Sequence, residues 1–197
     1  MRHLGYALLC CVAFAAPAAA APLTVVNVGA PAINCVFNPS CTVVVTDSIG
    51  NFTLPLDTGS GRLQSRTFDS VTGAPAYPLK GYDYRIDMTA MKGITAKNCI
   101  SAMKIDFGPV PTLIYKPGVP SQLYVVTMGG LGSVAVTSAD FTGGILTVQF
   151  KDTVCPGQTS YFFGLAAKGR PVNTNATLTP TIPGPAVTTV PARAPKH

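Results

Sequence analysis

Side chains suited to general acid–base chemistry are scarce in this chain. It has no Glu, and its acidic side chains are eight Asp residues. Its two histidines are His3 and His197, close to the two ends of the sequence. Catalytic triads that use His, His-rich zinc sites and glycosidase sites built on paired Glu side chains are therefore disfavoured. The composition favours a protein that is not an enzyme.

One short motif is an exception. Residues 48–63 include the run Asp57-Thr58-Gly59, placed after an apolar stretch. This segment resembles the active-site strand of pepsin-like and retroviral-type aspartic peptidases. The resemblance implies that Asp57 is the catalytic acid/base, that Thr58 supports its loop and that Gly59 permits a tight turn. In that family two such aspartates share one proton and activate water.

The chain does not repeat this motif. The nearest second copy, at residues 140–143, carries an intruding Phe between its Asp and its Thr. A peptidase would therefore need a homodimer that uses Asp57 from each subunit. The other interpretation is that Asp57 belongs to an ordinary turn, because Asp, Gly and Ser favour turns on their own. We favour the turn and keep the homodimeric aspartic-type peptidase as the alternative.

Four cysteines lie beyond the first 20 residues: Cys35, Cys41, Cys99 and Cys155. They form no C-x-x-C pair and have no His nearby, so we expect disulfides rather than a metal site, and no cofactor. Four cysteines allow three pairings. We favour Cys35–Cys41, across the mouth of a hairpin, and Cys99–Cys155. The second bond closes a long loop, which is worth about 4 kcal/mol in the chain-entropy view.

Three parts follow from the composition. Residues 1–20 have a basic start, an apolar run and a small-residue cleavage site, which is typical of a signal peptide. Residues 21–169 read as one β domain. Residues 170–197 are rich in Pro and Thr, and we predict a disordered tail. No later run reaches the roughly 18 apolar residues of a membrane helix, so we expect a secreted or periplasmic protein.

The middle part predicts an all-β fold. β-branched residues dominate its ordered-looking segments, and turns recur at the spacing of a sandwich. In residues 81–90, Tyr82, Tyr84 and two apolar residues alternate with charged ones, as in a strand with one wet face. Residues 32–37 and 42–46 read as a hairpin, followed by a turn at 47–51. We predict a disulfide-stabilised antiparallel β-sandwich, Ig-like or jelly-roll-like.

The ligand is not apparent from the residues. Tyr82 and Tyr84, with Tyr77 nearby, are candidates for an aromatic sugar-binding platform. The chain has a formal net charge of +6, but its basic residues are scattered, which argues against nucleic acid as a partner. We expect a binding or structural module whose partner is a surface protein, a glycan or a second copy of itself. The order of motifs between residues 63 and 166 also resembles uncharacterised secreted bacterial β proteins, a likeness that implies no activity.

Overall fold

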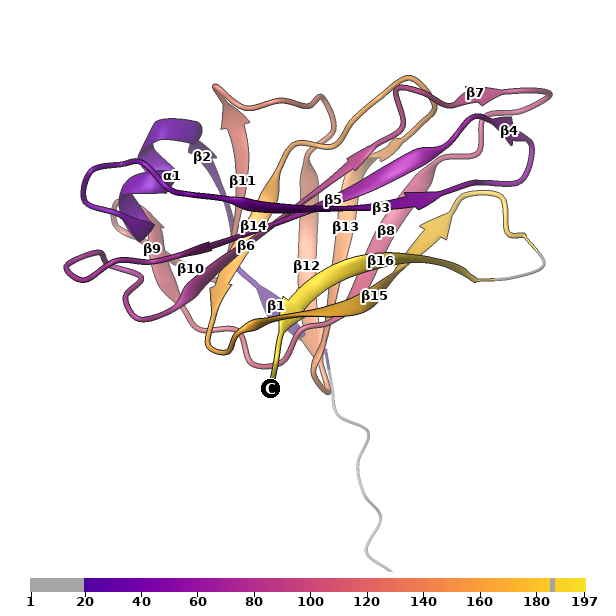
Figure 1. The fold of residues 1–197 in the computed structure, drawn as a ribbon. Helices are drawn as coiled ribbons and strands as arrows, with labels where there is room; N and C mark the ends of the chain where they lie inside the picture. Colours follow the sequence, from indigo (N-terminus) through magenta and orange to yellow (C-terminus); the bar gives the residue numbers. More distant parts are fainter. Residues whose placement is uncertain (1–19, 185–186) are drawn as a thin grey trace, which may run out of the picture.

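Two six-stranded β-sheets pack face to face in this protein (Figure 1). The computed structural model describes residues 20–184 and 187–197, so the expected signal peptide lies outside the described residues except for its last position. The predicted disulfide-bonded, all-β sandwich is confirmed. Among the described residues, no helix is long and apolar enough to cross a membrane.

The first sheet, sheet A, is antiparallel throughout, with the strand order β1-β12-β13-β8-β15-β16. Its strands are β1 (Ala21–Leu23), β12 (Val136–Thr142), β13 (Ile145–Val154), β8 (Ile100–Asp106), β15 (Pro171–Pro180) and β16 (Thr188–Pro195).

The second sheet, sheet B, has the order β2-β11-β14-β6-β5-β3, and only the β2–β11 pair is parallel. Its strands are β2 (Val25–Gly29), β11 (Leu123–Met128), β14 (Phe163–Ala167), β6 (Lys80–Asp87), β5 (Gly61–Asp69) and β3 (Thr46–Phe52). Two short ribbons complete the fold: β4 (Asp57–Thr58) with β7 (Lys92–Gly93), and β9 (Leu113–Lys116) with β10 (Val119–Ser121).

The main core lies between the two sheets, and β6 shows how the sequence builds it. Tyr82, Tyr84 and Ile86 point inward and are fully buried, as the period-two alternation predicts. The outward residues of the same strand are only partly exposed or buried, because the outer face of sheet B is itself covered at one end. The prediction of one wet face is therefore correct only for part of the sheet.

The chain closes the sandwich along both sides. At one side a single residue, Thr24, separates β1 in sheet A from β2 in sheet B. At the other side β16 packs against β3, where a Cβ on Gly50 would collide with the Pro191 carbonyl oxygen. The Tyr84 hydroxyl also donates to the Arg193 carbonyl oxygen at 2.6 Å, which ties β16 to sheet B.

A second, smaller apolar cluster lies on the outer face of sheet B, beneath helix α1 (Ala30–Phe37). The predicted hairpin strand at residues 32–37 and the turn at 47–51 are wrong, because these residues form α1 and part of β3. Pro31 in the first helical turn fixes a helical φ, and Ile33, Val36 and Phe37 recur at helical spacing and are buried. Helix α1 thereby covers part of the outer face of sheet B, which the sequence pattern predicted to be exposed to solvent.

The prediction of a disordered tail at 170–197 is also wrong for the described residues. Strands β15 and β16 pair in register over eight positions, and β15 also pairs with β8. Small apolar side chains point into the core on alternate positions of β16: Val190, Ala192 and Ala194. Pro191 fits because β16 is an edge strand with one side free of ladder hydrogen bonds.

Candidate functional site

The tyrosine platform predicted from the sequence is not formed. Tyr82 and Tyr84 are fully buried between the sheets, and their hydroxyls donate to the carbonyl oxygens of Gly169 and Arg193. Tyr77 is 53% exposed, on the loop that precedes β6. The three rings do not share a surface, because the alternation of β6 sends its tyrosines into the core.

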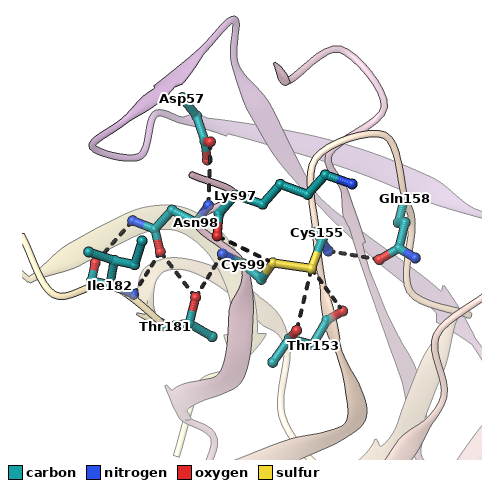
Figure 2. The surroundings of a disulfide bond; sticks show 9 residues. All are labelled: Asp57, Lys97, Asn98, Cys99, Thr153, Cys155, Gln158, Thr181 and Ile182. Atoms are coloured by element: carbon teal, nitrogen blue, oxygen red, sulfur yellow. Dashed lines mark hydrogen bonds between the residues drawn. A yellow bond between two sulfur atoms is a disulfide. The ribbon is translucent and has the colours of Figure 1, made fainter. Parts of the chain in front are cut away.

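Asp57 begins the short strand β4, directly after a small turn, beside the Cys99–Cys155 disulfide (Figure 2). Its backbone N–H donates to the Leu54 carbonyl oxygen at 3.4 Å, and its Oδ1 accepts the Asn98 N–H at 3.4 Å. Gly59 has a φ of +81°, which the turn requires. The Thr58 hydroxyl donates to the Lys92 carbonyl oxygen at 3.3 Å, within the ribbon of β4 and β7.

The surroundings of Asp57 favour the turn interpretation over the catalytic one. Its Oδ2 is buried and has no hydrogen-bond partner among the described residues. A peptidase carboxylate must reach both a water molecule and the twin carboxylate of its partner. The protein's own chain encloses this oxygen, so a second subunit would meet backbone and side chains before it met Asp57 Oδ2.

The four cysteines form the two predicted bonds, Cys35–Cys41 and Cys99–Cys155. The first bond joins α1 to the turn that follows it rather than two strands of a hairpin. In the second, the chain on either side is held by polar contacts: Asn98 donates to the Ile182 carbonyl oxygen at 3.0 Å, and Gln158 accepts the Cys155 N–H at 3.0 Å. Within residues 20–184 and 187–197, no three His, Cys, Asp or Glu side chains gather as metal ligands would.

A cleft of about 300 Å³ opens on the outer face of sheet B, beside α1. Helix α1, the extended segment after Cys41 and the Gly129-Gly130-Leu131 turn form its walls, and strands of sheet B form its floor. The lining residues are mostly apolar, with two charged side chains among them, Arg66 and Asp83. Concave, mostly apolar cavities with a few polar groups are the usual form of small-molecule sites. We call this feature the α1 cleft.

The two charged residues belong to a polar row that crosses sheet B. Asp47, Arg66 and Asp83 are register partners on β3, β5 and β6. Arg66 Nε donates to Asp47 Oδ1 at 2.9 Å, whereas no ion pair joins Arg66 to Asp83 within the described chain. The row continues through Gly164 on β14 to Tyr124 on β11, whose hydroxyl donates to Asp83 Oδ1.

Gly164 makes the contact between Tyr124 and Asp83 possible. A Cβ at this position would collide with Asp83 Oδ1 and would lie 2.7 Å from both the Tyr124 hydroxyl and the Tyr82 carbonyl oxygen. The missing side chain leaves a gap in the row, through which the tyrosine reaches the acid two strands away. A residue with any side chain here would separate the two groups.

Burial shifts the pKa values of two residues at the cleft, Asp83 and Tyr124. Burial raises the pKa of Asp83 to about 7, against the opposing effects of the Tyr124 hydrogen bond and the positive charge of Arg66. Burial also raises the pKa of Tyr124 well above its ordinary value, so its hydroxyl stays protonated and continues to donate. Asp83 Oδ2 has no hydrogen bond to the described chain. The carboxyl group therefore changes charge near neutral pH and keeps one oxygen for a further donor.

Two arginine side chains pack over the ring of Phe162, which lines the cleft. The guanidinium carbon of Arg66 lies 4.3 Å from the centre of the Phe162 ring, and that of Arg85 lies 5.0 Å from it. A cation over an aromatic face is stabilised by the ring's negative electrostatic potential. This contact and Asp47 hold Arg66 in place, while no hydrogen bond to its two Nη atoms is found in the described residues.

The sequence alone missed this site. Asp83 was visible only as an outward residue of a regular strand, and Tyr124 and Gly164 belong to segments about 40 and 80 residues away. The one usable signal was the pair of charged residues, Asp83 and Arg85, in a strand with an aromatic inner face. Comparisons with family models, with curated proteins and with solved structures found no match to this chain.

Proposed function

We propose that this protein is an exported, disulfide-stabilised β-sandwich that works by binding a ligand in the α1 cleft rather than by catalysis. The observation that carries the proposal is the cleft itself, which measures about 300 Å³, is lined by both apolar and polar surface, and contains two charged side chains with unused hydrogen-bonding atoms. Asp83 supplies an acceptor and Arg66 supplies donors, from neighbouring strands of a rigid sheet.

The arrangement of the polar groups supports binding over chemistry. A hydrolase of the kind that the Asp57 motif suggests needs two carboxylates that share a proton. Asp57 Oδ2 is instead enclosed by its own chain, and Asp83 is hydrogen-bonded to a tyrosine and faces an arginine. Neither aspartate therefore has the second carboxylate that this mechanism requires.

The disulfides support an extracellular setting. Two bonds form among the described cysteines, and such bonds persist mainly in oxidising compartments. The predicted signal peptide at 1–20 points the same way. We therefore place the protein in the periplasm or outside the cell, where its partner is a surface protein, a glycan, a small solute or a second copy.

The proposal is tested by filling the cleft. Asn34 on α1 lines it, so Asn34→Trp places a large ring inside the cavity. Val44→Trp is the matched control, because Val44 is 88% exposed and lies outside the α1 cleft. Wild type and both variants, as residues 21–197, are immobilised and exposed to fractionated pools of glycans, small solutes and surface proteins, and bound species are identified by mass spectrometry.

We expect species that bind wild type and Val44→Trp but are lost with Asn34→Trp. Equal binding by all three proteins would overturn the role of the cleft. A parallel assay of peptide cleavage between pH 3 and 7, with Asp57→Asn alongside, addresses the alternative. Cleavage that the Asp57→Asn variant loses would replace this proposal with a homodimeric aspartic-type peptidase, and a dimer in solution would accompany it.

A further inference from the structure

Two residues of opposite charge type in the described chain, Arg66 and Asp83, line the α1 cleft without a salt bridge between them. Arg66 and Asp83 are register partners on adjacent strands, yet no ion pair joins them within the described chain. Arg66 is drawn toward Asp47 and Phe162 instead, and Asp83 toward Tyr124. Each group keeps free hydrogen-bonding atoms and lines the same cavity. A ligand that offers a cation to Asp83 and an anion to Arg66 would use both groups at once.

We propose that the α1 cleft binds a small zwitterion with an apolar side chain, namely a free α-amino acid of aliphatic or aromatic type. The proposal rests on the proposed binding function and specifies its ligand. The ammonium group donates to Asp83 Oδ2, and the carboxylate accepts from the Nη atoms of Arg66. Charge-assisted hydrogen bonds of this kind are among the stronger ones in proteins.

The walls of the cleft favour an apolar side chain on the bound amino acid. Ile33 from α1, Val43 from the segment before β3 and Val126 from β11 line it, together with Phe68 and Phe162. None of these carries a charge, so an apolar side chain is favoured there and a charged one would lose its hydration. Because the cavity measures about 300 Å³, at the low end for ligand sites, a single amino acid suits it better than an oligosaccharide.

The balance of charge supports a ligand of zero net charge. A simple amine would be attracted by Asp83 but repelled by Arg66, and a simple carboxylate would meet the reverse. The other titratable groups on the Asp83 side of sheet B are Tyr124 from β11, Tyr115 from β9, Asp47 from β3 and Arg85 from its own strand, whereas Tyr82 and Tyr84 point to the opposite face of β6. Helix α1 adds no titrating group to this set, since Cys35 is disulfide-bonded.

Binding of the zwitterion should then depend on pH. The ammonium group pairs with the ionised form of Asp83, so the affinity rises with pH between about 6 and 8, as that carboxyl loses its proton. A ligand held only by its apolar side chain would show no such rise. The pH profile therefore separates an electrostatic contact from hydrophobic burial.

The experiment is isothermal titration calorimetry of residues 21–197 with four probes that dissect one molecule. L-Leucine carries both charges and the side chain. L-Leucinol lacks the carboxylate, 4-methylpentanoate lacks the ammonium group, and glycine lacks the side chain. We expect L-leucine to bind at least about tenfold more tightly than each of the other three, a difference that one charge-assisted contact supplies.

Variants assign the contacts. Asp83→Asn and Arg66→Gln should each weaken L-leucine about tenfold, and Asp83→Asn should remove the pH dependence. Arg62→Gln is the matched control, because Arg62 is on the same strand as Arg66 but pairs with Asp87 outside the cleft, at 2.9 Å. Amide proton–nitrogen correlation spectra of each free variant verify that its fold is intact before titration.

The outcomes separate the two proposals. If L-leucine, L-leucinol and 4-methylpentanoate bind equally well, and Asn34→Trp abolishes all three, the cleft is a binding site but the zwitterion is wrong. If none of the four probes binds wild type, the zwitterion is again wrong, and the capture experiment alone decides the binding function. Selective binding of L-leucine that Asp83→Asn weakens and Arg62→Gln does not would establish the inference.

Discussion

The turn at Asp57 and the α1 cleft lie at opposite ends of the sandwich, near β4 and α1 respectively (Figure 1). The turn carries the residue pattern that looks catalytic in the sequence, but its carboxylate has one oxygen on a backbone N–H and the other enclosed. The cleft carries no motif, but its carboxylate has a tyrosine donor, a neighbouring arginine and access to a cavity. The chemical properties of an aspartate therefore depend on the residues that other strands place around it, and not on its local sequence motif.

Each of the two disulfides belongs to one of these regions. Removing Cys99–Cys155 by two Ala substitutions should lower the free energy of unfolding by about 4 kcal/mol, because it closes a loop with a sequence separation of 56. Removing Cys35–Cys41, with a separation of 6, should cost about 2 kcal/mol. Urea denaturation followed by circular dichroism measures both.

The affinity for L-leucine should depend on the two disulfides in the opposite order. Cys35–Cys41 fixes the end of α1, a wall of the cleft, so its loss should weaken L-leucine severalfold even where the protein remains folded. Loss of Cys99–Cys155 should leave the affinity unchanged under the same conditions. Equal losses of affinity in both variants would show that the two ends of the molecule are coupled.

Gly164→Ala should be the most damaging single substitution in the cleft region. The added Cβ collides with Asp83 Oδ1 and crowds the Tyr124 hydroxyl, so overpacking and the loss of a buried hydrogen bond should together cost about 3 kcal/mol. Gly29→Ala is the control, since its Cβ would meet nothing closer than 3.9 Å. Thermal unfolding of the two variants should differ clearly, and similar midpoints would mean that the sheet moves to accept the methyl group.

The pH dependence of stability should report Asp83. Its pKa is about 7 in the folded state and 3.8 ordinarily, so between these values the folded protein retains a proton that the unfolded chain has lost. This group therefore lowers stability as pH rises from about 4 to 7, by at most about 1.4 kcal/mol per pH unit, and has no further effect above that window. The difference between wild type and Asp83→Asn in urea denaturation isolates the contribution.

The substitution Tyr124→Phe tests what sets the pKa of Asp83. Removing the hydroxyl deletes a hydrogen bond that lowers the pKa of Asp83, so the midpoint of its titration should move upward from about 7. Tyr84→Phe makes the same chemical change on the opposite face of β6 and should leave the midpoint in place. Carbon-13 NMR of the aspartate carboxyl groups follows both titrations, and a downward shift in Tyr124→Phe would contradict this description.

Asp57→Asn should have the smallest effect of all. The amide keeps an oxygen for the Asn98 N–H and removes a charge from an oxygen that has no described partner, so the free energy of unfolding should change by less than about 0.5 kcal/mol. The affinity for L-leucine should not change. A loss of several kcal/mol would show that the charge of Asp57 matters to the fold, which the turn interpretation does not anticipate.

The sequence predicted the layers of this fold better than its edges. Strict alternation of large apolar and charged residues placed β6 and its inward tyrosines correctly, because period two has no other structural explanation. The helix at residues 30–37 was missed because its apolar residues were counted as a strand and Pro31 was not taken as a helix start. Strands β15 and β16 were missed because Pro and Thr outweighed the small buried residues between them.

The site could not be predicted in the same way. Burial raises the pKa of Asp83, Tyr124 and Arg66 oppose that rise, and these two residues and Gly164 come from three other strands. The order of the strands in a sheet depends on the whole chain and cannot be read from local sequence patterns. By contrast, the disulfide pairing that we favoured among the three possible ones is confirmed, because Cys35 and Cys41 lie close together in the sequence and Cys99 and Cys155 were left to each other.

The position of β15 and β16 in the sandwich has a consequence for biosynthesis. These strands emerge from the ribosome after every other described strand, yet β15 pairs with β8 in the middle of sheet A, and β16 supplies part of the core and packs against β3. The nascent chain therefore cannot complete its core until residues near 195 are available. The sandwich can therefore close only after its last described strand has been made.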